Sequence, residues 1–180
     1  MTKSDSIEIF FSKLDKQKRN DFDCGVGPLN NYLRMSAGQE GRKSVSVTYV
    51  MCLGERVIGY YTLSSNSVDF SELPTEKVKK LPRYPKLPVT LLGRLAIDLN
   101  YRGKGYGTLL LAHALKKAVT ASADVASYAV IVDAKDIAAE KFYLSFGFIP
   151  YEETRKLFLP METILHGSKT HEDTARTAKL

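Results

Sequence analysis

Three glycines and two cations lie close together in the middle of this 180-residue chain, in the run Arg102-Gly103-Lys104-Gly105-Tyr106-Gly107. An apolar run precedes them and an amphipathic run follows, so the sequence places them in a turn between a buried strand and a helix. Glycines let such a turn approach a ligand closely, and the start of the helix offers unpaired N–H groups with a partial positive charge. This pattern predicts a site for a phosphate-bearing ligand, with Arg102 and Lys104 beside it.

Other nucleotide-binding turns fit this spacing less well. A Walker A loop needs G-x-x-x-x-G-K followed by Ser or Thr, which is absent, and a dinucleotide fingerprint needs G-x-G-x-x-G where this turn has G-x-G-x-G. Asp133 ends the next expected strand at about the position of a ribose-binding acid, which keeps the dinucleotide alternative open. The turn follows a predicted hairpin and precedes one further parallel strand, and this order favours the pyrophosphate of coenzyme A.

The order of predicted elements places the turn in a mixed sheet. Strands are expected at residues 7–11, 45–53, 56–65, 87–98 and 127–133, with two short closing strands within 148–159. Helices are expected at residues 28–35, 75–81, 108–119 and 137–146, the last of them ended by Gly147. Hairpins come first and a strand–helix–strand–helix unit follows, which predicts one α/β domain with helices on both faces of the sheet and a right-handed crossover. The nearly continuous apolar run at 87–98 predicts a strand buried on both faces.

The composition is that of an ordinary globular protein, with 44% hydrophobic and 26% charged residues. There is no run of about eighteen apolar residues and no secretory signal, so we expect no membrane span and a cytoplasmic location. The histidines do not cluster with cysteines or carboxylates at metal-ligand spacing, so we expect no metal, and Cys24 and Cys52 are expected to be reduced thiols. Residues 1–166 are expected to form the domain, and the polar residues 167–180 a disordered tail.

The positive charge is concentrated in one segment. The whole chain carries a net charge of +6, whereas residues 77–104 alone carry eight basic side chains against one acid, Asp98, for a net of +7. One interpretation is a solvated surface, and the other is an anionic partner, either coenzyme phosphates or nucleic acid. The candidates for contact with a polyanion are Lys77, Lys79, Lys80, Arg83, Lys86 and Arg94. Arg94 interrupts an apolar strand, where a charge normally needs a partner.

The turn and several other stretches resemble the GNAT N-acetyltransferase superfamily. Its acetyl-CoA signature has Arg or Gln three residues before a Gly and five residues before a Gly or Ala, as Arg102, Gly105 and Gly107 do here. The resemblance covers about residues 5–160 and is closer still to the GNAT toxins of bacterial type II toxin–antitoxin modules. The stretches that carry this closer resemblance are residues 21–25, 29–33, 92–98 and 141–148.

The resemblance implies a single GNAT domain with a mixed central sheet of about six or seven strands. It implies an enzyme that moves the acetyl group of acetyl-CoA to the α-amino group of aminoacyl-tRNA, blocks translation, and is neutralised by a ribbon-helix-helix antitoxin; relatives commonly form homodimers. The implied acetyl-CoA contacts are Leu95, Ala96, Ile97, Arg102, Gly103, Lys104, Gly105, Tyr106, Gly107 and Thr108. The implied catalytic residue is Tyr143, although a tyrosine in an apolar helix is, without the resemblance, more typical of a core.

The residue pattern also bears on the acceptor, because an amine must be neutral to attack a thioester. The strand at 87–97 contains no carboxylate that could serve as a base, Asp98 comes only at its end, and a relay through water or Glu140 stays open. A lysine with a pKa of about 10.4 needs a base, whereas an α-amino group with a pKa of about 8 is already partly neutral at pH 7. This favours an α-amine. The alternatives are an acetyltransferase for a small-molecule or protein amine, and a regulatory module that keeps the coenzyme pocket without catalysis.

Overall fold

The computed structural model describes residues 8–151 and 154–167. The strands are β1 (Ile9–Lys13), β2 (Val47–Leu53), β3 (Arg56–Asp69), β4 (Lys86–Ile97), β5 (Ala129–Asp133), β6 (Ile149–Tyr151) and β7 (Lys156–Pro160). The helices are α1 (Gly27–Asn31), α2 (Ala37–Arg42), α3 (Thr75–Val78), α4 (Tyr106–Ser122) and α5 (Ile137–Ser145), and residues 161–167 are also helical. A π-helical turn, Tyr32–Ser36, joins α1 to α2, and the short 3-10 turns are Phe70–Glu72 and Leu99–Tyr101.

The strands form one seven-stranded sheet in the order β1-β2-β3-β4-β5-β7-β6. β4 and β5 are parallel, while β1–β2, β2–β3, β5–β7 and β6–β7 are antiparallel, so the predicted α/β fold with a mixed sheet is confirmed. The expectation that β4 is buried on both faces is wrong. Leu87 and Val89 are buried, but Lys86 and Pro88 between them are exposed, and Gly93 is exposed further along. In its first half, β4 therefore buries one face and exposes the other.

The chain divides into two compact units, each described here by itself. The first unit is formed by residues up to Ser64 together with Leu92–Ala114, and the second by Ser65–Leu91 together with the residues from Leu115 onward. The single domain at residues 1–166 stays a prediction. The tail predicted at 167–180 lies outside the described residues, apart from residue 167 at the end of a helix.

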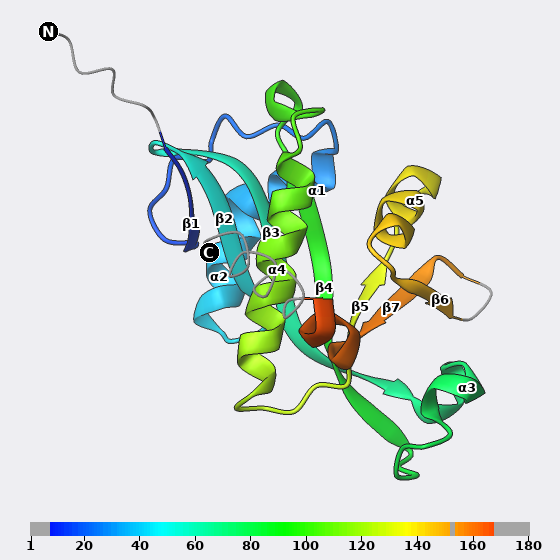
Figure 1. Cartoon of the computed structure of the whole chain (residues 1–180). Helices are drawn as coiled ribbons and strands as arrows, with labels where there is room; N and C mark the ends of the chain where they lie inside the picture. The colour runs from blue at the N-terminus through cyan, green and yellow to red at the C-terminus, as the bar shows by residue number, and fades with distance from the viewer. Residues whose placement is uncertain (1–7, 152–153, 168–180) are drawn as a thin grey trace, which may run out of the picture. The chain divides into compact units, whose positions relative to one another are not determined.

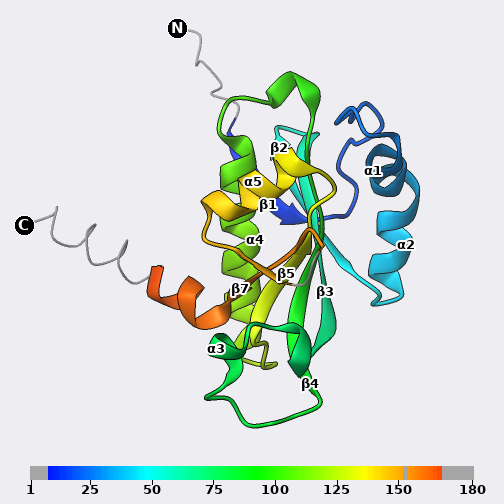
Figure 2. The ribbon, with the colours of Figure 1, turned by 90° about the vertical axis from the view of Figure 1, so that its right-hand side faces the viewer.

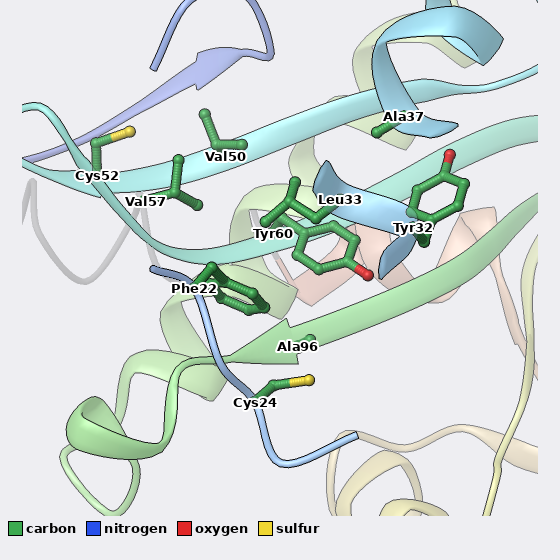
Figure 3. Packing of buried hydrophobic residues seen from close by; sticks show 10 residues of the cluster. All are labelled: Phe22, Cys24, Tyr32, Leu33, Ala37, Val50, Cys52, Val57, Tyr60 and Ala96. Atoms are coloured by element: carbon green, nitrogen blue, oxygen red, sulfur yellow. The ribbon is translucent and has the colours of Figure 1, made fainter. Parts of the chain in front are cut away.

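The first unit is a small sheet with helices on both faces. β1, β2 and β3 lie side by side (Figure 1), and Figure 2 shows α1 and α2 on one side of β2 and β3, with the first turns of α4 on the other. The helices α1 and α2 cover a cluster of buried side chains that includes Phe22, Leu33, Tyr60 and Ala96 (Figure 3). This cluster holds β4 against the hairpin, and so fixes where the glycine turn begins. Cys24 and Cys52 are buried free thiols, as expected.

The second unit contains the start of β4 and the closing strands. β5 pairs in parallel with β4 at Thr90 and Leu91, and β7 pairs with β5 on its other edge (Figure 1). Its core is a separate cluster of buried apolar side chains, among them Val89, Ile131 and Phe158. In this unit α5 begins at a capping residue, because the carboxylate of Asp136 accepts a hydrogen bond from the Ala139 N–H at 2.8 Å. The helix ends before Gly147, whose φ of +85° favours glycine.

A fully buried carboxylate, Asp98, ends β4 and binds the segment that leads to the glycine turn. It accepts hydrogen bonds from the Asp23 N–H at 3.2 Å, and from both the backbone N–H and the side-chain amide of Asn100 at 3.0 Å. The guanidinium of Arg56 lies 3.7 Å from the same carboxylate. In return, the Leu99 N–H donates to the Asp23 carbonyl at 2.8 Å. Asp98 therefore joins three segments of the first unit that are distant in sequence.

Removing this carboxylate is expected to destabilise the protein strongly. Asp98→Ala removes the acceptor of three N–H donors and the partner of the half-exposed Arg56 guanidinium, so we expect a loss of about 3 kcal/mol or more in the free energy of unfolding. Urea unfolding followed by circular dichroism measures it. Glu76→Ala is the control, because Glu76 is an exposed acid paired with Lys79 on the surface, and we expect a change of about 0.5 kcal/mol or less. Equal effects of the two substitutions would contradict the role given to Asp98.

Candidate active site

The glycine turn has the geometry of an anion site at a helix start. Gly103 and Gly105 have φ values of +72° and +81°, and a Cβ added at either would meet no atom within 4 Å, so the backbone is open to a ligand. α4 then runs for 17 residues from Tyr106. The first hydrogen bond of this helix is from the Leu109 N–H to the Gly105 carbonyl at 3.2 Å. The N–H groups of residues 105–108 precede that bond, and these are the groups that a phosphate accepts from.

The two cations of the turn have different roles. The guanidinium of Arg102 donates to the Cys24 carbonyl at 2.5 Å, so it anchors the turn to the segment before α1. Lys104 is exposed; its ammonium donates to the Asn100 carbonyl at 3.2 Å and lies 5.4 Å from the centroid of the Tyr101 ring. Neither cation is paired with a carboxylate among the described residues. Both therefore keep their charge available to an anion at the turn.

The strand residues predicted to contact the acetyl group directly precede Asp98 in the same unit. Leu95 is half-buried, whereas Ala96 and Ile97 are buried. The Ile97 side chain lies against Gly59, where an added Cβ would come within 2.7 Å of its Cδ1 atom. The structure therefore brings Leu95–Ile97 and the turn at residues 102–108 into one unit, joined by Asp98 and the 3-10 turn.

Tyr143 lies on α5, in the second unit. It is buried with 8% exposure, and its ring contacts those of Phe142 and Phe148, at centroid distances of 5.4 Å in both cases. Burial raises the pKa of the Tyr143 hydroxyl to about 12. Among the described residues no hydrogen bond holds that hydroxyl. At neutral pH this phenol is therefore a proton donor and cannot act as a base.

The basic residues predicted to contact a polyanion fall into two places. Lys77, Lys79, Lys80, Arg83 and Lys86 are exposed in and after α3, in the second unit. Lys79 pairs with Glu76, and Lys86 lies 3.7 Å from the carboxylate of Asp69. Arg94 is half-buried in the first unit, with its guanidinium carbon 3.6 Å from the centroid of the Tyr32 ring. Its charge thus has an aromatic partner.

The sequence did not reveal how the segment before α1 supports the turn. The Asp23 carboxylate accepts from the Gly25 N–H at 2.8 Å and from the Asn30 side-chain amide at 2.7 Å, and these two hydrogen bonds lower its pKa. The amide oxygen of Asn30 in turn accepts from the Cys24 N–H at 2.9 Å. Two stretches that carried the resemblance, residues 21–25 and 29–33, are thereby joined. The spacing of an Asp and an Asn around a glycine was the only signal for this arrangement.

Two further properties of the described residues bear on the class of protein. No group of three or more His, Cys, Asp or Glu side chains in residues 8–151 and 154–167 is placed to hold a metal ion. Within the same residues, every helix is too short or too polar to cross a lipid bilayer. The mixed α/β sheet, with the glycine turn between β4 and α4, fits the class of fold that the sequence resemblance implied.

Comparison with known families identifies the family. The model of the acetyltransferase (GNAT) family matches residues 18–148, which is most of the chain. The chain therefore belongs to the GNAT acetyltransferase family, and the resemblance inferred from the glycine turn is confirmed. The match begins before α1 and ends at the start of β6, so it includes the turn, β4 and α5.

The chain is also similar to individual toxins. A tRNA-acetylating toxin of Mycobacterium tuberculosis is 34% identical over 134 residues, which are 74% of this chain and 80% of that protein. The structure of AtaT complexed with acetyl-methionyl-tRNAfMet has a TM-score of 0.82 at 34% identity, and it covers 87% of this chain and 97% of that chain. A tyrosine-to-phenylalanine mutant of KacT has a TM-score of 0.83 at 31% identity, with 88% and 98% covered.

A substitution in the glycine turn is expected to weaken acetyl-CoA binding. Gly105→Ala adds a side chain where φ is +81°, a conformation that costs about 1–2 kcal/mol for a residue with a Cβ. We expect the dissociation constant for acetyl-CoA, measured by isothermal titration calorimetry, to rise about tenfold as the turn relaxes. Gly27→Ala is the control, because Gly27 lies in α1, outside the positive-φ region and with open space around it. Unchanged acetyl-CoA binding by Gly105→Ala would contradict the assignment of the turn.

Proposed function

We propose that this protein transfers the acetyl group of acetyl-CoA to the α-amino group of aminoacyl-tRNA, and that it acts as the toxin of a toxin–antitoxin module. The observation that carries the proposal is the turn between β4 and α4, where open glycines and the first N–H groups of a helix follow a strand fixed by Asp98. The 34% identity to a tRNA-acetylating toxin supports the choice of acceptor. Such a reaction takes place in the cytoplasm, where aminoacyl-tRNA is used.

Different residues of this chain would bind different parts of acetyl-CoA. Acetyl-CoA supplies the acetyl group as a thioester, which is activated for attack by an amine. The backbone N–H groups of residues 105–108 and the charges of Arg102 and Lys104 would hold its phosphates. Backbone groups of Leu95–Ile97 would orient the thioester carbonyl. Both parts would be required: the turn would hold the phosphates of the coenzyme, and the strand residues would orient its thioester bond.

Tyr143 would donate a hydrogen bond to the departing thiolate. Its phenol, with a pKa of about 12, is a weaker acid than a thiol with a pKa of about 8.5. Complete proton transfer from the phenol to the thiolate would therefore be uphill. Hydrogen bonding to the developing negative charge carries no such cost, so we assign Tyr143 this role.

The acceptor amine would need no strong base. The carboxylate of Asp98 is fully buried and already bound by Asp23, Asn100 and Arg56, so it is not free to take a proton from a substrate. Glu140, the other carboxylate considered, lies 3.7 Å from the guanidinium of Arg155. An α-amino group with a pKa of about 8 loses its proton to water readily near neutral pH. This supports an aminoacyl group over a lysine side chain as the acceptor.

A ribbon-helix-helix antitoxin is part of the proposal. Among the similar structures are a tyrosine-to-phenylalanine mutant of the toxin AtaT bound to the C-terminus of the antitoxin AtaR, with a TM-score of 0.75 at 30% identity, and a complex of KacTA with DNA, with a TM-score of 0.76 at 28% identity. A homodimer stays a prediction from the resemblance. The second candidate function is acetylation of a small-molecule or protein amine, and it is supported only by membership of the GNAT acetyltransferase family.

Removing the hydroxyl of Tyr143 is expected to remove most of the activity. Tyr143→Phe keeps the ring that packs on Phe142 and Phe148 and loses only the donor, so we expect kcat to fall by about 10²–10⁴-fold. The KM for acetyl-CoA and the unfolding midpoint should stay near those of the wild type. Single-turnover acetylation of aminoacyl-tRNA measures the effect, and growth after induced expression gives a cellular readout. Growth arrest by Tyr143→Phe equal to that of the wild type would exclude the proposed role.

The pH dependence of the rate should report the acceptor amine alone. Because the pKa of Tyr143 is raised to about 12, its hydroxyl stays protonated and should not limit the rate below about pH 10. We expect log kcat/KM to rise with unit slope up to about pH 8, where the α-amine becomes neutral, and then to level off. The measurement uses a hydrolysis-resistant amide-linked aminoacyl-tRNA. A decline between pH 8 and pH 10 would point to another proton donor.

The exposed cations near α3 are expected to bind RNA phosphates. Lys77, Lys80 and Arg83 have no ion-pair partner among the described residues, whereas Lys79 and Lys86 are already paired. Replacing the first three with Gln should therefore weaken tRNA binding about uniformly across tRNA species and reduce the slope of log K against log salt by about 2–3. Replacing Lys79 and Lys86 is the matched control and should have a smaller effect. An unchanged salt slope in the triple variant would show that Lys77, Lys80 and Arg83 do not contact RNA phosphates.

A further inference from the structure

A pocket of about 400 Å³ opens on the first unit, apart from the glycine turn. Its lining comes from the helical segment around the π turn and from one residue of β4. The lining residues are Pro28, Leu29, Asn31, Tyr32, Met35, Ser36 and Arg94. The volume lies at the lower end of the range for small-ligand sites, which suits a group of about the size of one nucleotide.

Arg94 supplies the only charge of this lining. The carbon of its guanidinium lies over the Tyr32 ring, 3.6 Å from the ring centroid, so the cation makes a cation–π contact with the ring. The N–H groups point outward in the plane of a guanidinium, and among the described residues no hydrogen bond or ion pair holds those of Arg94. A planar guanidinium with free N–H groups is the side chain best suited to grip a phosphate with two hydrogen bonds.

Tyr32 is held in place from the side away from the pocket. Its hydroxyl donates to the Glu40 carboxylate at 2.8 Å and lies 3.0 Å from the Ser46 hydroxyl, which donates to the same carboxylate oxygen at 2.9 Å. The ring stacks beside that of Tyr60 (Figure 3). Tyr60 in turn donates to the Leu29 carbonyl at 2.8 Å. Tyr32 is therefore a positioning residue, which fixes the plane in which Arg94 can act.

The place of Arg94 on β4 indicates which part of the reaction the pocket serves. Side chains two residues apart share a face of a strand, so Arg94 lies on the same face as Ala96. Ala96 belongs to the cluster under α1 and α2 (Figure 3), whereas Ile97 lies on the opposite face of β4, near Gly59 and the Leu110 side chain of α4. A ligand on Arg94 thus comes from the α1 side, one residue away from the strand segment assigned to the acetyl group.

We propose that this pocket binds the terminal nucleotide of the acceptor RNA, with the phosphate on Arg94 and the base against Leu29 and Met35. Met35 is 78% exposed and presents an apolar surface at the π turn, and π turns of this kind recur at functional sites. Asn31 and Ser36 add hydrogen-bonding groups for ribose hydroxyls. The inference rests on the proposed function and adds to it a second RNA contact, distinct from the exposed cations near α3.

The test compares acceptors with and without the nucleotide. Arg94→Lys keeps the charge and loses the planar pair of donors, so we expect the KM for aminoacyl-tRNA to rise about tenfold with kcat nearly unchanged. Acetylation of an amino-acid methyl ester, which carries no nucleotide, should not change. Arg42→Lys is the matched control, because Arg42 is exposed on α2 and does not line the pocket. Tyr32→Phe should raise the same KM about threefold, with the unfolding midpoint measured in parallel.

A binding measurement separates this inference from the proposed function. A labelled trinucleotide with the 3′-terminal sequence of tRNA should bind the wild type and bind Arg94→Lys about tenfold more weakly, as followed by fluorescence anisotropy. If the wild type binds the trinucleotide in this way but does not acetylate aminoacyl-tRNA, the pocket stands and the proposed function fails. Equal binding by both proteins, or none by either, overturns the pocket assignment. An equal loss of methyl-ester acetylation in Arg94→Lys also overturns it, because Arg94 would then act on the reacting groups.

Discussion

The buried carboxylate of Asp98 is the constraint on which the position of the glycine turn in the first unit depends. A charge with no exposure to water is stable only when it is fully bound, and here its partners come from three segments: the loop at Asp23, the 3-10 turn at Asn100 and the start of β3 at Arg56. Its position at the end of β4 means that satisfying the charge also sets where the strand stops. The same requirement fixes the position of the glycine turn, because the Arg102 guanidinium donates a hydrogen bond to the Cys24 carbonyl in the loop that also contains Asp23.

The same network explains why the turn can hold open glycines. A backbone in the positive-φ region with no side chains around it has little packing to keep it in place. Asp98 and Arg102 fix the chain just before Gly103, and α4 fixes it just after Gly105. The flexible residues are thus few and lie between two rigid anchors. In the proposed function, a turn held in this way would be organised before the anion arrives, which would lower the entropy lost on binding.

The elements of the fold could be predicted where local pattern decides them, and the site only in part. The order of the strands and of most helices followed from apolar periodicity, and the turn from the spacing of Gly103, Gly105 and Gly107, whereas α2 and the helix at residues 161–167 were not expected. The burial of β4 was mispredicted because apolar residues such as Pro88 and Gly93 can line an open face, and composition does not record which face is covered. The partners of Asp98 and the stacking of Arg94 on Tyr32 could not be predicted from the sequence, because both depend on contacts between residues far apart along the chain.

The two sets of cations illustrate why charge in the sequence does not by itself locate a partner. Residues 77–104 form one basic segment along the chain, yet the structure sorts it into separate environments. The cations near α3 are exposed, so in the proposed function each would contribute to RNA affinity mainly through release of counterions and without regard to sequence. Arg94 is half-buried and oriented by an aromatic ring, so a phosphate bound to it has a fixed place relative to β4. Long-range attraction and local placement of an acceptor are distinct physical tasks, and only the second requires the rigid frame that Tyr32, Glu40 and Ser46 provide.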